Sequence, residues 1–424
     1  MRRGPPFPFR TPFHHSVTQK QSLRNKVVKV LVINSGSSSL KFTLFDMTDK
    51  SVLAKGLVER IGLDAPKLIY QPNGRKFEEA LTIKNHSEAL LEVCKKLVDT
   101  EVGVLKSLSE VQAIGHRVLH GGKKYTSPIV VDEAVKQGIR DCIVLGPLHN
   151  PANLGGIEAC EQVFPGVPNV AVFDTAFHQT MGPEAYMYAI PREYYEKYDV
   201  RKYGFHGTSH KFVYFNTCEF LGLDPAKAKV ITCHLGNGSS LAAVNGGKVL
   251  DTSMGLTPLM GLVMGTRCGD MDPAVVPFLM KMTGMTPDQI DTMMNKKSGL
   301  LGVSGLSSDM RDIEAARDNG NQNAKEAYDM FLHRLIHYIG GYYLLLGGAD
   351  AIVFTGGIGE NGIDTRRAVA QKLAVLGATF DAEANNCRGK QVVFSTPESK
   401  FKLVVTPTNE ELMIAMETVA LTAK

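Results

Sequence analysis

Two short turns rich in glycine and serine follow strand-like runs of β-branched residues in this sequence. Asn34-Ser-Gly-Ser-Ser-Ser-Leu-Lys41 follows the run 29–33, and His234-Leu-Gly-Asn-Gly-Ser-Ser240 follows the run 230–232. Glycine lets the main chain approach an anion closely, and successive N–H groups and serine hydroxyls supply donors for it. A third glycine-rich stretch, 355–361, lies between a strand-like run and a helical pattern. One such turn is weak evidence, but three of them predict a site for phosphate or a nucleotide.

Two arginines and one aspartate stand where they could complete this site. Arg117 lies between a predicted strand and a Gly-Gly turn, and Arg267 lies in a loop flanked by glycines. The planar guanidinium group suits bidentate contact with phosphate or carboxylate. Asp174 ends an apolar strand-like run, which is where α/β folds hold Mg²⁺, although an isolated aspartate there is as well explained by capping of the next turn.

His206 and His210 have the i, i+4 spacing of zinc ligands on a helix. Gly207 and the lack of a nearby third ligand argue against a zinc site. The preferred interpretation is a single histidine donor at a turn, with Thr208 or Ser209 capping the helix that follows.

Composition excludes several classes of protein. The chain has 424 residues, 44% of them apolar and 21% charged, which allows two domains with their own cores. Seven of the 47 basic residues lie in the first 29, which contain no acidic residue, and the rest of the chain is slightly acidic, so a nucleic acid partner is not indicated. The seven cysteines form no Cys-x-x-Cys motif, which favours a reducing compartment. No apolar run approaches the roughly 18 to 20 residues that cross a bilayer, so no membrane partner is indicated either.

Residues 1–28 are basic and contain four prolines, which predicts a disordered extension. It is interpreted either as an organelle transit peptide or as an extension without function from a vector or an upstream start. The prolines weaken the amphipathic helix that a mitochondrial signal needs. The predicted location is the cytoplasm, with an organelle matrix as the alternative if the extension is a transit peptide.

Periodicity and turn residues predict the elements that position the site. Helices are expected at 88–98, 324–345 and 412–421, strands at 170–177 and 402–405, and a hairpin with an Asn-Gly turn at 241–250.

Five of these stretches together resemble the acetokinase family, within the superfamily of acetate and sugar kinases, Hsp70 and actin. They are 34–41, 204–210, 234–240, 264–272 and 355–361, and the resemblance covers residues 29–424. It implies an α/β fold of two duplicated actin-like domains, with mixed sheets flanked by helices and an active-site cleft between them. The implied units are the extension 1–28, an N-terminal domain 29–176, a C-terminal domain 177–400 with the nucleotide site and a homodimer interface, and a segment 401–424 that closes back on the N-terminal domain. A hinge is expected near 175–180.

The resemblance also implies roles for individual residues. The catalytic residues would be Arg117, Asp174, His206, Arg267 and His149. The acyl group would lie in a slot formed by Arg117, Leu119, Leu148, Phe205 and Pro258. ATP, the co-substrate, would be bound by Ser37, Ser39, Lys41, His234, Leu235, Gly236, Asn237, Gly238, Asp309, Met310, Arg311, Gly356, Gly357, Ile358, Gly359 and Asn361. Asn34 and Glu410 would hold Mg²⁺, with Mn²⁺ also suitable.

The implied reaction is the reversible in-line transfer of the γ-phosphoryl group of ATP to acetate, which gives acetyl phosphate and ADP. Propionate or butyrate kinase is the alternative within the family, and a nucleotide switch of the Hsp70 or actin type is the alternative outside it. Leu119 replaces the usual valine, which should narrow the acyl slot and favour acetate, whereas Lys123 and Met260 replace usual glutamates outside the catalytic positions.

Overall fold

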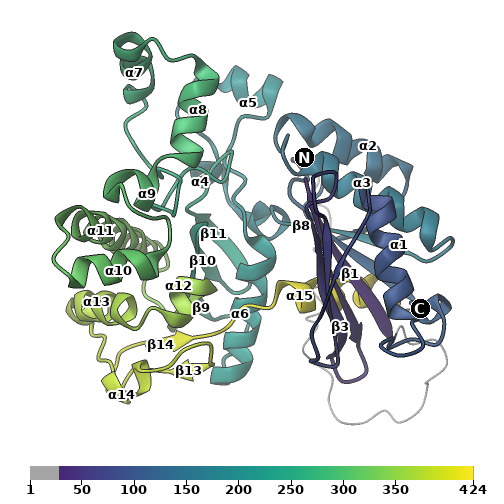
Figure 1. Ribbon diagram of the computed structural model, residues 1–424. Helices are drawn as coiled ribbons and strands as arrows, with labels where there is room; N and C mark the ends of the chain where they lie inside the picture. Colours follow the sequence, from purple (N-terminus) through teal and green to yellow (C-terminus); the bar gives the residue numbers. More distant parts are fainter. Residues whose placement is uncertain (1–27, 424) are drawn as a thin grey trace, which may run out of the picture.

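The computed structural model describes residues 28–423 and contains two mixed sheets with helices on both faces (Figure 1). The extension predicted for residues 1–28 therefore lies almost wholly outside the described residues. The first sheet has the strand order β5-β4-β3-β2-β1-β6-β8-β7. Its strands are β1 (Lys29–Gly36), β2 (Ser39–Asp46), β3 (Ser51–Glu59), β4 (Lys67–Pro72), β5 (Phe77–Ala80), β6 (Ala113–Val118), β7 (Ile129–Val130) and β8 (Asn169–Phe173).

The second sheet repeats the central pattern of the first. Its order is β11-β10-β9-β12-β14-β13, with an antiparallel meander, two parallel strands and an antiparallel edge strand. In the first sheet, β1, β6 and β8 are likewise parallel neighbours, and β7 is the antiparallel edge strand. The second set of strands is β9 (Lys229–Leu235), β10 (Ser239–Asn245), β11 (Lys248–Thr252), β12 (Ala351–Thr355), β13 (Val392–Val393) and β14 (Lys402–Val405). The two mixed sheets flanked by helices confirm the predicted fold class.

The helices of the first sheet cover its two faces. On one face α1 (His86–Leu97), α2 (Glu133–Asp141) and α3 (Asn150–Val163) bury aliphatic side chains against the strands. On the other face lies α15 (Glu410–Thr422), which buries Ile414 and Ala415 against Val30 and Val170. The yellow C-terminal segment crosses from β14 of the second sheet to this helix in Figure 1. The last helix of the chain thus completes the core of the first sheet.

The second sheet is covered by α6 (Gly207–Leu221) on one face and by a group around the long α11 (Gln322–Leu345) on the other. That group includes α9 (Gly299–Ser304), α10 (Met310–Asp318) and α13 (Ile363–Leu373). The other helices are α4 (Pro183–Tyr186), α5 (Arg192–Tyr198), α7 (Val275–Thr283), α8 (Pro287–Lys296), α12 (Gly356–Asn361) and α14 (Ala382–Asn385). Single 3₁₀ turns lie at η1 (Leu108–Glu110), η2 (Cys142–Val144), η3 (Ala176–Thr180) and η4 (Ala374–Leu376). Between residues 28 and 423, none of the helices has the length and apolar character that spanning a membrane would take.

Two local predictions were wrong. Neither Thr208 nor Ser209 caps α6, because the helix begins at Gly207 and His206 occupies the N-cap position with a left-handed backbone, φ 56°. The stretch 355–361 is not a loop before a helix, because α12 begins at Gly356 directly after β12. Gly356 has φ 75°, and a Cβ there would lie 2.7 Å from the carbonyl oxygen of Leu235, so only glycine allows this abrupt change of direction. The boundaries predicted at 176 and 400 stay predictions.

Candidate active site

The candidate site lies where the carboxyl ends of the central strands of the two sheets meet. Arg117 is near the end of β6 and Asp174 directly follows β8, so the parallel register places them side by side. The second sheet reaches them through α6, because the N–H of Gly207 donates to the carbonyl oxygen of Asp174 at 2.8 Å. The hydroxyl of Thr208 donates to the Asp174 carboxylate at 3.3 Å. Residues far apart in the sequence are therefore joined at one point.

Two carboxylates, the buried Asp174 and the partly exposed Glu410, lie near Arg117. Its guanidinium forms an ion pair with Asp174, whose side chain is only 2% exposed. Burial opposes the charge of Arg117, but the carboxylates of Asp174 and Glu410 outweigh it and raise the guanidinium pKa. Burial and repulsion from Asp174 raise the pKa of Glu410 to about 7, although Arg117 and Lys41 act in the opposite direction. The first turn of α15 thus brings Glu410 into the site, where Asn409 caps the helix by accepting from the N–H of Leu412 at 3.0 Å.

The histidines near the arginines are neutral. Burial lowers the pKa of His206 well below its usual value, and the nearby His234, His210 and the two arginines lower it further. Burial also lowers the pKa of His149, with further contributions from Arg117 and Arg267. The ring of His206 stacks on that of His234 with centroids 4.2 Å apart, and burial lowers the pKa of His234 to about 4.

Arg267 lies beside the second glycine turn. A Cβ added at Gly238 would lie 3.3 Å from Nη1 of Arg267 and 3.5 Å from Nε2 of His206. Nη1 donates to the carbonyl oxygen of Pro258 at 3.2 Å. Burial lowers the pKa of Arg267, and within residues 28–423 no ion pair joins it to a carboxylate. A guanidinium of this kind is available to an anion.

The glycine turn at 236–238 is packed against two other segments of the second sheet. The N–H of Gly265 donates to the carbonyl oxygen of Asn237 at 3.0 Å. A Cβ at Gly265 would lie 1.7 Å from Oδ1 of Asn237 and 3.0 Å from the carbonyl oxygen of Ser308, so a larger residue there would displace the Asn237 side chain. A Cβ at Gly236 would lie 4.0 Å from the N atom of Gly357, at the start of α12. The predicted phosphate turn and the predicted nucleoside segment are therefore neighbours.

The other predicted ATP residues lie around these turns. Asp309 caps α10 and forms an ion pair with the exposed Arg311 at 2.6 Å, while Met310 is buried. In the first sheet the turn between β1 and β2 exposes Ser37, and the charge of Lys41 on β2 reaches Glu410. Asn34 pairs with Lys41 in the same hairpin.

A small apolar cluster lies next to the charged groups. It consists of Leu119, Phe205, Met254 and Met264, all at most 5% exposed. The sequence prediction contained Leu119 and Phe205 but missed the two methionines, which no local signal distinguishes from core residues. Leu148 is 68% exposed and is not part of this cluster, so its predicted role in substrate binding stays a prediction.

Sequence reasoning also missed the buried Asn153 of α3. Its side-chain oxygen accepts from the N–H of Leu119 at 3.0 Å, and its amide donates to the carbonyl oxygen of Ser35 at 2.8 Å. It therefore ties the first hairpin to the strand end that carries Arg117. Asn150 lies three residues earlier on the same helix and is fully buried. Asn150 is the first residue of α3, where asparagine is common, whereas Asn153 lies within the helix, where asparagine is disfavoured, so only Asn153 was an available signal.

The oxygen donors near Arg117 suit a hard divalent cation. Among the described residues no group of three or more histidine, cysteine or acidic side chains forms a closed metal cage. Burial, and then repulsion from Asp174, nevertheless raise the pKa of Glu410, and a cation would relieve that repulsion. Mg²⁺ commonly uses one or two carboxylates and completes its octahedron with water and phosphate oxygens, so these residues fit Mg²⁺.

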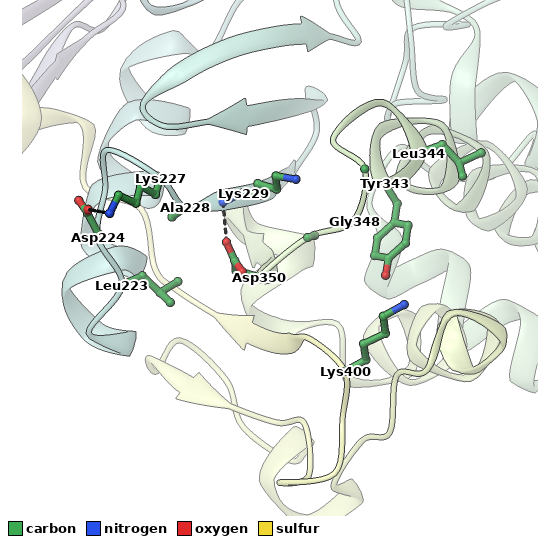
Figure 2. A pocket seen from close by; sticks show the side chains of 12 residues that line it. Leu223, Asp224, Lys227, Ala228, Lys229, Tyr343, Leu344, Gly348, Asp350 and Lys400 are labelled. Carbon is green, nitrogen blue, oxygen red and sulfur yellow. Dashed lines mark hydrogen bonds and ion pairs between the residues drawn. The ribbon is translucent and has the colours of Figure 1, made fainter.

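A separate cavity of about 630 Å³ lies at the opposite edge of the second sheet (Figure 2). It borders the amino ends of β9 and β12, whereas the glycine turns follow their carboxyl ends. Figure 2 shows the Lys227–Asp224 ion pair of 3.7 Å and the hydrogen bond of 2.7 Å from the N–H of Lys229 to Asp350. This cavity includes none of the predicted site residues.

A site that gathers positive charge around bare main-chain N–H groups is typical of enzymes that transfer phosphoryl groups. The chain belongs to the acetokinase family, whose model matches residues 29–416. A relative from Finegoldia magna, an acetate kinase, is 56% identical over 93% of this chain and 100% of its own length. The crystal structure of Porphyromonas gingivalis acetate kinase has a TM-score of 0.90 at 47% identity, covering 93% of this chain and 99% of that one. A propionate kinase from Francisella tularensis has a TM-score of 0.86 at 42% identity, with the same coverage.

Proposed function

We propose that this protein is an acetate kinase, which transfers the γ-phosphoryl group of ATP reversibly to acetate and forms acetyl phosphate and ADP. The observation that supports this most is the meeting of Arg117, Arg267 and the neutral His206 beside a small buried apolar cluster. Such a site offers charge for two anions and only a little apolar surface for an acyl group.

The chemistry requires no general base, because a carboxylate is already a nucleophile. The barrier comes from bringing two anions together and from the charge that develops on the phosphoryl oxygens. Arg117 is oriented by Asp174 and would hold the acetate carboxylate or a phosphoryl oxygen. Arg267 and His206 would donate to the phosphoryl group in transfer.

The nucleotide would lie on the second sheet. The turn 236–238 would bind the phosphates through main-chain N–H groups, and the segment from Gly356 to Asn361, with Asp309 to Arg311, would border the adenosine. The turn with Ser37 and Ser39 and the ammonium of Lys41 would approach the phosphates from the first sheet. Leu119, Phe205 and Pro258 would contact the methyl group of acetate.

Mg²⁺ would be held by Glu410 and Asn34 with Asp174 nearby, and Mn²⁺ has a similar preference for oxygen ligands. When bound, the cation would neutralise phosphate charge. The chain's own contribution is to keep the two carboxylates close to Arg117. Removal of divalent cations with EDTA should abolish turnover, and addition of Mg²⁺ should restore it.

The decisive test is a hydroxamate assay of the purified protein with ATP, Mg²⁺ and, in parallel, acetate, propionate and butyrate, ranked by kcat/KM. We expect acetate to lead by about tenfold or more, because one methylene changes binding in a small apolar slot by about 1 to 3 kcal/mol. If propionate equals or exceeds acetate, the second candidate, a propionate kinase, replaces the first. ATP hydrolysis without acyl transfer would instead support a nucleotide switch.

We also propose that the protein is a homodimer that associates through the second sheet's helices. The sequence of α7, Val-Val-Pro-Phe-Leu-Met-Lys-Met-Thr, is almost wholly apolar, yet the helix has no buried residue. A cytoplasmic location is proposed as well, because all seven cysteines are free thiols, five of them buried, as is usual in a reducing compartment.

A further inference from the structure

Four side chains form a continuous chain of hydrogen bonds behind the candidate catalytic histidine. Oγ1 of Thr232 lies 2.7 Å from Nδ1 of His210, whose Nε2 lies 2.8 Å from Oγ of Ser240. The same Oγ lies 2.8 Å from Nδ1 of His206. Thr232, His210 and Ser240 are completely buried. The other ring nitrogen of His206, Nε2, faces the turn at Gly238.

Counting protons leaves two arrangements for this chain. The Ser240 hydroxyl has one hydrogen and two ring partners, so it donates to one ring and accepts from the other. In the first arrangement Thr232 donates to His210, His210 donates from Nε2 to Ser240, and Ser240 donates to Nδ1 of His206. The proton of His206 is then on Nε2. In the second arrangement every donor is reversed and the proton of His206 is on Nδ1.

The distances favour the first arrangement. In the second, the Thr232 hydroxyl would have to donate elsewhere, and the acceptor in reach is the carbonyl oxygen of Ala242 at 3.4 Å. That distance is beyond the usual range of an O–H···O bond. In the first arrangement Thr232, His210 and Ser240 each donate to an acceptor within 2.8 Å, and only Nε2 of His206, which faces the glycine turn, is left for a substrate. We propose that Thr232, His210 and Ser240 are positioning residues that fix His206 in the tautomer with its proton on Nε2, directed at the phosphoryl group.

The tautomer matters because the ring is neutral. A second proton is disfavoured first by burial, then by the ring of His234 stacked at 4.2 Å and by the nearby His210 and arginines. A neutral imidazole donates through one nitrogen only. If that nitrogen were Nδ1, His206 would present a lone pair to the phosphoryl oxygens and would oppose transfer. This inference rests on the proposed function for its consequence, but the proton positions can be measured without any substrate.

The first test is NMR of the protein labelled with ¹⁵N-histidine, at pH 7.5 and without ligands. We expect both His206 and His210 to show a protonated Nε2 and a proton-free Nδ1. Assignment uses His206→Asn and His210→Gln. A proton on Nδ1 of either ring in the wild type would overturn the proposal, whatever reaction the protein catalyses.

The second test reverses the direction of the chain. His210→Gln keeps an N–H donor toward Ser240, whereas His210→Glu offers it an acceptor of the same length. We expect His206 to keep the wild-type nitrogen signals in the first variant and to gain a proton on Nδ1 in the second. Identical His206 signals in the two folded variants would overturn the proposal. If His210→Glu does not fold, the wild-type spectrum still tests the tautomer of His206, and the variant Ser240→Ala, described next, still tests its role in catalysis.

The third test links the chain to catalysis. Ser240→Ala removes the bond to His206, and we expect kcat to fall by about 10- to 100-fold, the usual effect of removing a residue that orients a functional histidine. KM for ATP and for acetate should change by less than threefold, because Ser240 is completely buried behind His206. Thr217→Val removes another buried hydroxyl, whose one hydrogen bond within residues 28–423 is to Thr406 at 3.3 Å, and is the matched control for lost packing. An unchanged kcat in Ser240→Ala, or an equal loss in Thr217→Val, would contradict the role. Failure of the wild type to phosphorylate any of the three acids would reject the proposed function but not the tautomer.

Discussion

Arg117 forms an ion pair with Asp174 and, within residues 28–423, still has an N–H donor without a partner. Its ion pair with Asp174 fixes the direction of the guanidinium, while its buried Nε has no hydrogen-bond partner among the described residues. Arg267 differs, because among the described residues its guanidinium donates to no carboxylate, but to the carbonyl oxygen of Pro258 and to the sulfur of Met264 at 3.7 Å. The two arginines thus provide one donor group with a fixed orientation and one that a phosphoryl group can reorient.

Replacing either arginine should therefore impair transfer more than binding. We expect Arg117→Ala and Arg267→Ala each to lower kcat by about 10²- to 10⁴-fold, in line with arginines that stabilise phosphoryl transfer. Steady-state kinetics with acetate and ATP would measure this. Arg140→Ala removes an arginine in a half-exposed ion pair with Glu158 and should leave kcat unchanged. Wild-type turnover in Arg117→Ala or Arg267→Ala would remove that residue from the mechanism.

At the scale of elements, the sequence allowed prediction of what each segment does locally. The turns of Asn34–Lys41 and His234–Ser240 were predictable, because glycine and hydroxyl residues after a β-branched run have few other uses. The start of α11 was predicted within two residues. Contacts between distant segments were not predictable, because they depend on strand register and packing. Ser240 looks like one more anion donor of its turn, and Asn153 like a helix residue of unfavourable propensity, until the fold places each one between two segments of the site.

Asn153 offers a test at this scale, because it joins three elements. Its amide satisfies one main-chain donor at the end of β6 and one main-chain acceptor in β1. Asn153→Ala would leave both groups buried without partners, and each such group costs about 1 to 3 kcal/mol. We expect the free energy of unfolding to fall by about 2 to 4 kcal/mol and kcat to fall as well, since the Arg117 strand and the Ser37 turn lose their common support.

Urea unfolding and acetate turnover would measure the two effects of Asn153→Ala. Asn153→Asp is the informative companion, because it keeps the acceptor for Leu119 but replaces the donor to Ser35 by a buried carboxylate oxygen that repels the carbonyl, so its stability should fall at least as far. Asn319→Ala, at an exposed site, controls for the loss of an amide. Unchanged stability in Asn153→Ala would show that water replaces the side chain and that the link is dispensable.

At the scale of the whole molecule, the site belongs to neither sheet alone. The apolar cluster combines Leu119, which follows a strand of the first sheet, with Phe205, Met254 and Met264 from segments around the second. The C-terminal helix returns to the first sheet and contributes Glu410. Closure of the two sheets around the substrates would exclude water, which otherwise competes with acetate for the phosphoryl group.

Buried neutral histidines make the whole molecule sensitive to acid. Burial lowers the pKa values of His116, His120 and His178 to about 4. These depressed values contribute stability that is present above the unfolded pKa of about 6.5 and is lost as the pH falls toward 4. The free energy of unfolding, measured by urea at several pH values, should therefore decrease steeply from pH 6.5 to 4.5.

A variant of His116 measures the contribution of one histidine to this pH dependence. Its Nε2 lies 2.7 Å from Oδ1 of Asn169, and His116→Gln can keep a donor there without a titrating ring. Between pH 6.5 and 4.5, we expect the free energy of unfolding of His116→Gln to decrease by about 1 to 3 kcal/mol less than that of the wild type. His333→Gln, at an exposed position, should follow the wild type. Parallel pH profiles for His116→Gln and the wild type would show that His116 is not buried as a neutral ring.

The proposed dimer can be tested at the exposed face of α7, which we expect to lie in the interface. Phe278 is 61% exposed and Met282 is 66% exposed, and α7 lies at the far end of the second sheet's helices in Figure 1. Burial of such side chains in an interface contributes about 1.5 to 3 kcal/mol each. Phe278→Glu and Met282→Glu should each raise the dimer Kd by about 10- to 150-fold or more, measured by analytical ultracentrifugation. Leu63→Glu changes a 56% exposed residue beside the first sheet and should leave the dimer intact. If the wild type is a dimer that both α7 variants preserve, another surface holds it together; if the wild type is a monomer at micromolar concentration, the apolar exposure of α7 needs a different partner.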